Sequence, residues 1–372
     1  MRLEPFEMER MQSLWWHRVD HDLSESGVRP MTIRELLGPD ADGEAFLSGA
    51  LGYPVSEGSE ETRSHIAAWY PDASADHVTM TNGGSEANFL SLWTLLEPGR
   101  RLAFMVPNYL QGWGLGPHFG DASDPFLLRL RDGRWSLDLD SLDAAVRPET
   151  AAIMVCNPNN PTGAVLTEQE MSAVVAAAER VGAWIVADEI YRGAEVDTDE
   201  TSPTFWGRTE RVIVTSGLSK AFGMPGLRVG WAVAPPGMIA ELWERHDYTT
   251  LTPNIVSDRL AAVALEPRRR EEILARTRGI IRSNLPPLEE WIHAHEAFTY
   301  ARPVAGAIAY VEYDLPIGST ELVDRIREER SVLLVPGDQF GLERGLRFGT
   351  GYDIGSTLKG LALADEVLST LG

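Results

Sequence analysis

The segment Ser219-Lys220-Ala221-Phe222-Gly223 holds a lysine just after an apolar run, and Arg228 follows eight residues later. In an open parallel sheet the carboxyl ends of the strands line the ligand crevice. An amine at such a place can form a Schiff base with a carbonyl group, and an arginine can hold a phosphate through two hydrogen bonds. Because an isolated strand-end lysine is more often a solvated surface residue, this interpretation depends on the neighbouring segments.

A carboxylate follows another apolar run, in Ile185-Val186-Ala187-Asp188-Glu189-Ile190-Tyr191. A carboxylate beside a buried strand must be paired or hydrogen-bonded, or it becomes protonated. A pyridinium nitrogen is a suitable partner, because Asp188 would keep that ring an electron sink. Taken alone, Asp188 fits the N-terminal cap of a helix equally well.

Two further loops supply polar groups after strands. Asn157-Pro158-Asn159-Asn160-Pro161-Thr162-Gly163 predicts a rigid turn in which Asn160 presents its amide to the crevice. Thr81-Asn82-Gly83-Gly84-Ser85 opens a helix after a short strand at 78–81. Its small residues allow backbone N–H groups and the helix dipole to face a phosphate.

The elements that position these residues alternate between short apolar runs and amphipathic stretches. We expect strands at 102–106, 151–156, 183–187, 211–215 and 229–234, with helices between them, one of them at 85–96. Thr167 and Glu170 form a capping box for a helix that Gly182 ends. The pattern predicts an α/β sheet domain.

The C-terminal part has a different pattern. A polar helix from about Arg268 meets Pro286-Pro287, which predicts an interruption by a kink or a domain joint. Strands at 307–313, 332–335 and 346–349, with helices from 319 and up to 371, indicate a smaller α+β domain. The first 45 residues show no sheet pattern. The predicted division is therefore an N-terminal arm that is part of the small domain (1–45), a large domain (46–284) and a small domain (285–372).

Composition restricts the partners. The chain has 372 residues, with 33 Lys+Arg against 55 Asp+Glu and a formal net charge of −22. This balance argues against nucleic acid and anionic membranes as partners. The single cysteine, Cys156, and an N-terminus without an apolar stretch predict a cytoplasmic protein. His17 and His21 have zinc-like spacing but no third ligand nearby, so we expect no metal site.

In this order the four segments resemble the class I/II group of fold-type I aminotransferases, which use pyridoxal 5′-phosphate (PLP). The resemblance extends from about Gly52 to the C-terminus and depends on the Asn-Pro-x-Asn-Pro-Thr-Gly, Asp-x-x-Tyr and Ser-Lys-x-Phe-Gly signatures. It implies the fold of the type I PLP-dependent transferases, α/β with a large, mostly parallel sheet domain and a smaller α+β C-terminal domain.

By this resemblance Lys220 would hold PLP as a Schiff base and move a proton, while Asp188 would pair with the ring nitrogen. The catalytic residues would be Lys220, Asp188 and Tyr191. Asn160 and Tyr191 would hydrogen-bond the phenolic oxygen of the ring, and Tyr109 would stack on it. The phosphate would be held by Gly83, Gly84, Ser85, Ser219 and Arg228. Gly217 stands where several members have a hydroxyl, which leaves Ser219 as the expected phosphate donor.

The resemblance also implies substrate and subunit contacts. Arg347, in Leu346-Arg347-Phe348-Gly349, would bind the α-carboxylate of an amino acid, beside Asn160. Tyr53 would reach the phosphate of a neighbouring subunit, which predicts a homodimer with shared active sites. Trp15, Trp16, Trp113 and Trp206 could line a substrate or subunit pocket, or could be packed in the core.

The stretch Leu23-Ser24-Glu25-Ser26-Gly27-Val28 is similar to the N-terminal stretch of capreomycidine-synthase-like enzymes, which eliminate or cyclise in secondary metabolism. In this fold the stretch lies near the substrate, so Gly27 could pass its backbone close to the carboxylate. An ordinary turn before a helix at 33–37 explains the same residues equally well.

Three hypotheses follow. The first is a PLP-dependent aminotransferase acting on an α-amino acid through a Lys220 Schiff base. The second keeps PLP and makes the protein a lyase, cyclase or decarboxylative oxidative deaminase acting on an amino acid or its conjugate in natural-product biosynthesis. The third is a catalytically idle PLP-fold regulator. The intact set of Lys220, Asp188 and Arg228, together with the absence of a basic DNA-binding region, disfavours the regulator.

Overall fold

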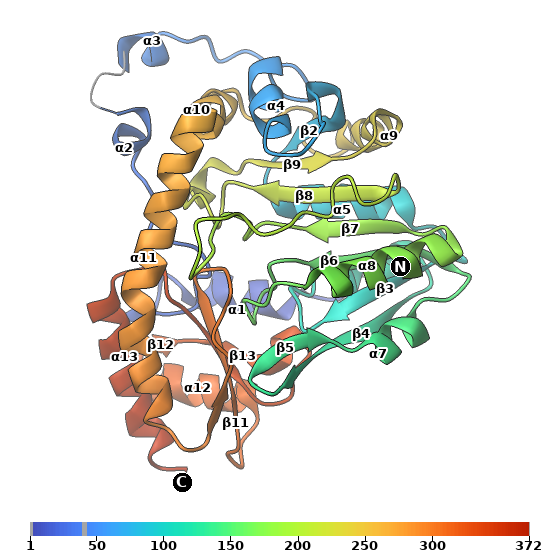
Figure 1. Ribbon diagram of the computed structural model, residues 1–372. Coiled ribbons are helices and arrows are strands. Elements are labelled where there is room, and N and C mark those ends of the chain that lie inside the picture. Colours follow the sequence, from blue (N-terminus) through green and yellow to red (C-terminus); the bar gives the residue numbers. More distant parts are fainter. Residues whose placement is uncertain (1–2, 39–42, 372) are drawn as a thin grey trace.

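A large, mostly parallel sheet forms the centre of the computed structural model, which describes residues 3–38 and 43–371 (Figure 1). Within those residues the sheet has eight strands in the order β2-β9-β8-β7-β6-β3-β4-β5. Strands β8, β7, β6, β3 and β4 run parallel, whereas the pairs β2–β9, β8–β9 and β4–β5 are antiparallel. The strands are β2 (Val78–Thr81), β3 (Arg101–Val106), β4 (Ala122–Arg131), β5 (Arg134–Leu137), β6 (Thr150–Cys156), β7 (Trp184–Asp188), β8 (Val212–Gly217) and β9 (Gly230–Val233). The predicted α/β fold class is confirmed.

Helices cover both faces of this sheet, which is why its central strands are apolar on both sides. Every residue of β6 and β8 is buried. Leu90 and Leu92 of α5 lie in two apolar clusters on one face, shared with α6 and α9, and Met171 and Val174 of α8 pack on the other. The helices around the sheet are α4 (Glu60–Ala67), α5 (Gly84–Leu95), α6 (Gln111–Phe119), α7 (Leu139–Ala145), α8 (Glu168–Val181), α9 (Pro236–His246) and α10 (Ile255–Leu265).

The ends of α8 follow the sequence signals. The side chain and backbone N–H of Thr167 both donate to Glu170 Oε2, at 2.6 and 2.7 Å, in a capping box. Gly182 ends the helix in the left-handed conformation, with φ of 68°. Thr32 and Glu35 form a second capping box at the start of α2 (Ile33–Leu37).

The C-terminal part contains an antiparallel sheet in the order β10-β11-β14-β13. The helices α12 and α13 pack against each other beside it (Figure 1). The elements are β10 (Phe298–Tyr300), β11 (Ile308–Tyr313), α12 (Ser319–Arg330), β12 (Val332–Leu333), β13 (Val335–Pro336), β14 (Leu346–Gly349) and α13 (Ile354–Leu368). One apolar cluster contains Ile153 of the large sheet and Val311 of β11, so the core is continuous between the two sheets.

The N-terminal segment carries a strand that the sequence did not predict. After α1 (Glu7–Trp15), β1 (His21–Asp22) pairs in parallel with β12. Two residues are too short a run to show a strand pattern, and their partner lies at the other end of the chain. The next residue, Leu23, contacts β14 as well, because its carbonyl accepts from the N–H of Gly349 at 2.8 Å. Helix α3 (Gly43–Leu47) completes the described segment.

Helix α11 (Pro267–His293) differs from its prediction, because it continues through Pro286 and Pro287 instead of being interrupted there. Ile281, Leu285 and Leu288 are buried on both sides of the prolines. Packing of this apolar face offsets the backbone hydrogen bonds that the two prolines cannot make. The helix therefore crosses the predicted boundary at 284/285, and the division into domains stays a prediction. Among the described residues, no helix combines the length and apolar character that a membrane span needs.

Candidate active site

A cavity of about 870 Å3 lies at the carboxyl ends of β6, β7 and β8. It brings together residues that are far apart in the chain, because parallel strands end at the same edge of a sheet. Ten of the predicted site residues line it: Gly84, Ser85, Tyr109, Asn160, Asp188, Tyr191, Ser219, Lys220, Arg228 and Arg347. Three others do not line it: Gly27, Tyr53 and Gly83.

Asp188, the last residue of β7, presents a carboxylate to the cavity from a buried position. Its Oδ2 accepts from Asn88 Nδ2 at 2.8 Å, and its Oδ1 accepts from the N–H of Ile190 at 3.1 Å. Asn88 is oriented in turn by Thr215, whose hydroxyl donates to Asn88 Oδ1 at 2.6 Å. Burial raises the pKa of Asp188, although these hydrogen bonds oppose the rise. A cationic ring nitrogen would relieve this burial cost, so the carboxylate fits a pyridinium group.

The predicted phosphate cradle surrounds Arg228. Gly83 has φ of +97°, a conformation in which any larger residue would be strained, and a Cβ there would also lie 2.3 Å from Arg228 Nη2. Helix α5 begins at the next residue without a side-chain cap, which leaves its first N–H groups for an anion. Arg228 Nη1 donates to Pro225 O at 3.1 Å and to Ser219 Oγ at 3.4 Å. Because Gly83 has no side chain, the guanidinium of Arg228 can lie directly against this turn.

Lys220 follows β8 and places its Nζ 2.8 Å from Glu25 Oε1. Burial lowers the pKa of Lys220, but the charges of Glu25 and Tyr191 outweigh it, and the pKa lies above the ordinary lysine value. Glu25 was not predicted as a site residue, although the sequence analysis placed its segment near the substrate. The backbone of Gly27 packs on the same lysine, because a Cβ there would lie 3.2 Å from Ser219 O and 3.7 Å from Lys220 Cα.

Arg347 on β14 is buried and lines the cavity from the C-terminal part of the chain. Its Nη1 donates to Asn160 Oδ1 at 2.9 Å, and its Nη2 donates to the carbonyl of Ser24. Its Nε has no partner in the described part of the chain. A buried guanidinium with a free N–H fits a carboxylate ligand.

Two tyrosines complete the ring site. Tyr191 donates to Ser26 Oγ at 2.9 Å, and burial raises its pKa. Tyr109 donates to Glu9 Oε1 at 2.8 Å and packs edge-to-face on Phe6, with ring centroids 4.8 Å apart. Both side chains are therefore held by residues from the N-terminal segment.

The N-terminal segment forms a second wall that sequence reasoning largely missed. Eight residues from the first 26 of the chain line the cavity: Met8, Glu9, Gln12, Trp16, His17, Asp22, Glu25 and Ser26. Gln12 donates to the carbonyl and the hydroxyl of Ser24, both at 3.0 Å. Two sequence signals touched this wall: Trp16 was named as a candidate pocket residue, and the resemblance of residues 23–28 pointed to Gly27 instead of Glu25.

Tyr53 lies away from this cavity, with 87% of its surface exposed. It borders a separate surface hollow with Asn82, Thr250 and Asn254. It therefore contributes nothing to the active-site cavity of its own chain.

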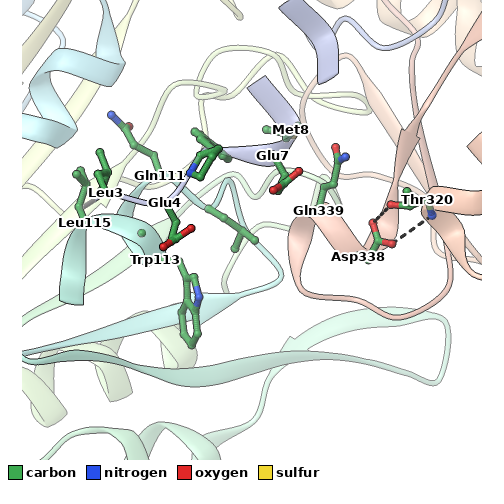
Figure 2. A pocket seen from close by; sticks show the side chains of 14 residues that line it. Leu3, Glu4, Glu7, Met8, Gln111, Trp113, Leu115, Thr320, Asp338 and Gln339 are labelled. Carbon is green, nitrogen blue, oxygen red and sulfur yellow. Dashed lines mark hydrogen bonds between the residues drawn. The ribbon is translucent and has the colours of Figure 1, made fainter. Parts of the chain in front are cut away.

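A neighbouring hollow of about 620 Å3 shares Met8 with the active-site cavity. Figure 2 shows Leu3, Trp113 and Leu115 on one side of it, and Asp338 and Gln339 on the other. Of the tryptophans singled out from the sequence, Trp113 borders this hollow, whereas Trp16 lines the active-site cavity. Trp15 instead packs under the guanidinium of Arg327, at 4.2 Å.

Together, the parallel sheet and a cavity with a strand-end lysine, a buried aspartate and a buried arginine define a PLP-dependent enzyme of the type I fold. The family model of the class I and II aminotransferases matches residues 44–353. The chain therefore belongs to the aminotransferase class I and II family, and its cofactor is PLP.

Relatives include both aminotransferases and a cyclase. The chain is 31% identical to the capreomycidine synthase of Streptomyces vinaceus over 94% of this chain and 90% of the relative. A PLP-dependent aminotransferase from Streptococcus suis matches with a TM-score of 0.92 and 29% identity, covering 100% of this chain and 99% of the other. The PLP-dependent cyclase OrfR matches with a TM-score of 0.85 and 30% identity, over 97% of each chain.

Proposed function

We propose that this protein transfers the amino group of an α-amino acid, with PLP on Lys220 and the α-carboxylate of the substrate on Arg347. The observation that carries the proposal is the shared cavity, which is lined both by Lys220 and by a buried Arg347 whose Nε lacks a partner among the described residues. An amino acid bound there would have its amino group near Lys220 and its carboxylate on Arg347.

Bound PLP supplies an electron sink for the bonds at the substrate's Cα. Asp188 would pair with the protonated ring nitrogen, with Asn88 keeping its carboxylate in place. Arg347 and Asn160 would hold the substrate carboxylate, which decides which Cα bond faces the lysine. Lys220 would then accept the Cα proton at Nζ and return it at the end of the reaction.

The remaining cofactor contacts are proposed on the same geometry. Arg228, Ser219 and the N-terminus of α5 at Gly84 and Ser85 would hold the phosphate. Tyr109 would stack on the ring, and Asn160 and Tyr191 would bind its phenolic oxygen. Substitution of Arg228 by Gln should weaken PLP binding in a fluorescence titration, and unchanged binding would contradict the assignment.

We also propose a homodimer with shared active sites, in which Tyr53 reaches the phosphate of the second subunit. Leu51, Tyr53 and Tyr248 are strongly exposed apolar side chains, as expected of a face that another subunit covers. Sedimentation should give a dimer. Mixed dimers of Tyr53→Phe and Lys220→Ala subunits should be more active than an equal mixture of the two parent dimers, because one site then combines an intact Lys220 with an intact Tyr53. Independent sites would give only the activity of that mixture.

A second candidate keeps PLP but ends in elimination or cyclisation in natural-product biosynthesis. Two observations favour it: the full-length similarity to a capreomycidine synthase and a cyclase, and the carboxylate of Glu25 beside Lys220. A protonated Lys220 could donate to a group leaving from the substrate's side chain.

The two candidates are separated by a test of amino acids with and without 2-oxoglutarate. Glutamate formed only with the acceptor supports amino transfer. Ammonia, water loss or a cyclic product without any acceptor supports the second candidate. A cytoplasmic location is proposed as well, on the single, buried Cys156, and fractionation of the producing cells would test it.

A further inference from the structure

Glu25 makes the closest acidic contact to the cofactor-binding lysine. Its Oε1 accepts from Lys220 Nζ at 2.8 Å, and also from the backbone N–H groups of Ser26 at 2.9 Å and Gly27 at 2.8 Å. Three donors on one oxygen hold the carboxylate in place before any ligand binds. The contact is also shielded, since only 26% of the lysine side chain and 21% of the glutamate side chain are exposed.

Other charged and titratable groups face the same amine. Tyr191 follows β7 and favours the charged form of Lys220, whereas Arg347 on β14 disfavours it. Asp22 and Tyr352 line the cavity next to Glu25. Burial raises the pKa of Glu25, but the charge and hydrogen bond of Lys220, with the N–H of Gly27, lower it to about 2. Glu25 is therefore ionised across the physiological range and is no proton acceptor itself.

We propose that Glu25 is a positioning residue, which holds the ε-amino group of Lys220 as an ammonium whenever that amine is not bonded to PLP. The ion pair holds Nζ at the place from which the lysine acts, and it stabilises the amine after a proton has been accepted. The proton stays on Lys220 Nζ until it is returned to the substrate, and Glu25 only supplies its charge.

The catalytic consequence rests on the proposed function. If Lys220 must be a free amine to accept the Cα proton, the ion pair moves the acidic limb of the pH–rate profile towards higher pH. Substitution Glu25→Gln should move that limb towards lower pH. The change that Glu25→Gln makes in the pKa of the Lys220 amine can be measured without PLP and without turnover.

The composition makes this measurement direct, because the chain has two lysines, Lys220 and Lys359. Trace labelling of the cofactor-free protein with acetic anhydride, followed by digestion and mass spectrometry, gives a rate for each lysine. Lys359, exposed on α13, serves as the internal reference. In Glu25→Gln the amide oxygen can still accept from Ser26 and Gly27, so charge is the main change. At pH values below the pKa of the Lys220 amine, we expect Lys220 in this variant to label roughly tenfold faster than in the wild type, which corresponds to a pKa lower by about one unit.

Asp22→Asn is the matched control, since it neutralises a carboxylate of the same cavity that is bound by Ser24 instead. It should leave the Lys220 rate unchanged. Equal rates in the wild type and Glu25→Gln would overturn the proposal, as would equal acceleration in both variants. If Glu25→Gln does not fold, Glu25→Asp replaces it in the test. The aspartate keeps the negative charge but places it farther from Lys220 Nζ, so Lys220 should label faster than in the wild type but more slowly than expected for Glu25→Gln. A labelling difference without amino-acid turnover would contradict the proposed function and leave this inference standing.

Discussion

The two walls of the cavity are positioned in different ways. Asn160, Asp188 and Lys220 lie at or just past the carboxyl ends of three consecutive strands, β6, β7 and β8, so the strand ends decide where they lie. Glu25 and its neighbours are placed by pairing with β12 and by contacts to β14, about 300 residues away in sequence. The sheet wall carries the residues to which we assign the cofactor chemistry, whereas the N-terminal wall contacts two of the proposed site residues, Lys220 and Tyr191.

The largest effect should follow from removing the reactive group of the sheet wall. Lys220→Ala should lower kcat by about 10³-fold or more, because the proton-moving amine and the covalent attachment of PLP are both lost. The absorbance band of the bound cofactor should change with it. Lys359→Ala, on α13, is the matched lysine control and should retain the wild-type rate.

The next effect concerns the electrostatics of the same wall. Asp188→Asn should lower kcat by about 10²-fold, because a neutral amide cannot hold the charge of a ring nitrogen. PLP should still attach to Lys220, as a mass measurement after reduction can verify. A variant with an unchanged kcat would remove Asp188 from its assigned role.

Arg347→Lys tests the place where the two walls meet. The lysine ammonium lacks the planar fork with which one guanidinium reaches Asn160, Ser24 and a carboxylate, so kcat/KM for the amino acid should fall by about 10²-fold. Cofactor affinity should stay near the wild-type value. Equal losses in cofactor and substrate binding would indicate a general collapse of the cavity instead.

The smallest expected effect is on stability. Since the folded-state pKa of Glu25, about 2, lies below its ordinary value of 4.5, its contribution is present above pH 4.5 and is lost as the pH falls towards 2. In the cofactor-free protein we expect this to be on the order of 1–2 kcal/mol, discounted for its partial exposure. The melting temperatures at pH 6 and at pH 3 should therefore differ less in Glu25→Gln than in the wild type. Parallel losses in both proteins would contradict the assigned pair.

The sheet wall could be predicted because its signals are local. Short apolar runs gave β7 and β8, and the polar residues at or just past their ends gave Asp188 and Lys220. The N-terminal wall gave no such signal. The two residues of β1 are too few for a periodic pattern, and the position of Glu25 depends on Gly349 and β12, which no local rule connects to it. The uninterrupted α11 was missed for a related reason, since the apolar face that holds it together is packed on distant elements.

The central claim is that PLP is carried by Lys220 in this cavity, and the presence of two lysines allows one measurement to test it. The protein is loaded with PLP, reduced with borohydride, digested and analysed for the lysine that carries the phosphopyridoxyl mass. We predict stoichiometric modification of Lys220 and an unmodified Lys359. Modification of Lys359 alone, or of neither lysine, would contradict the account.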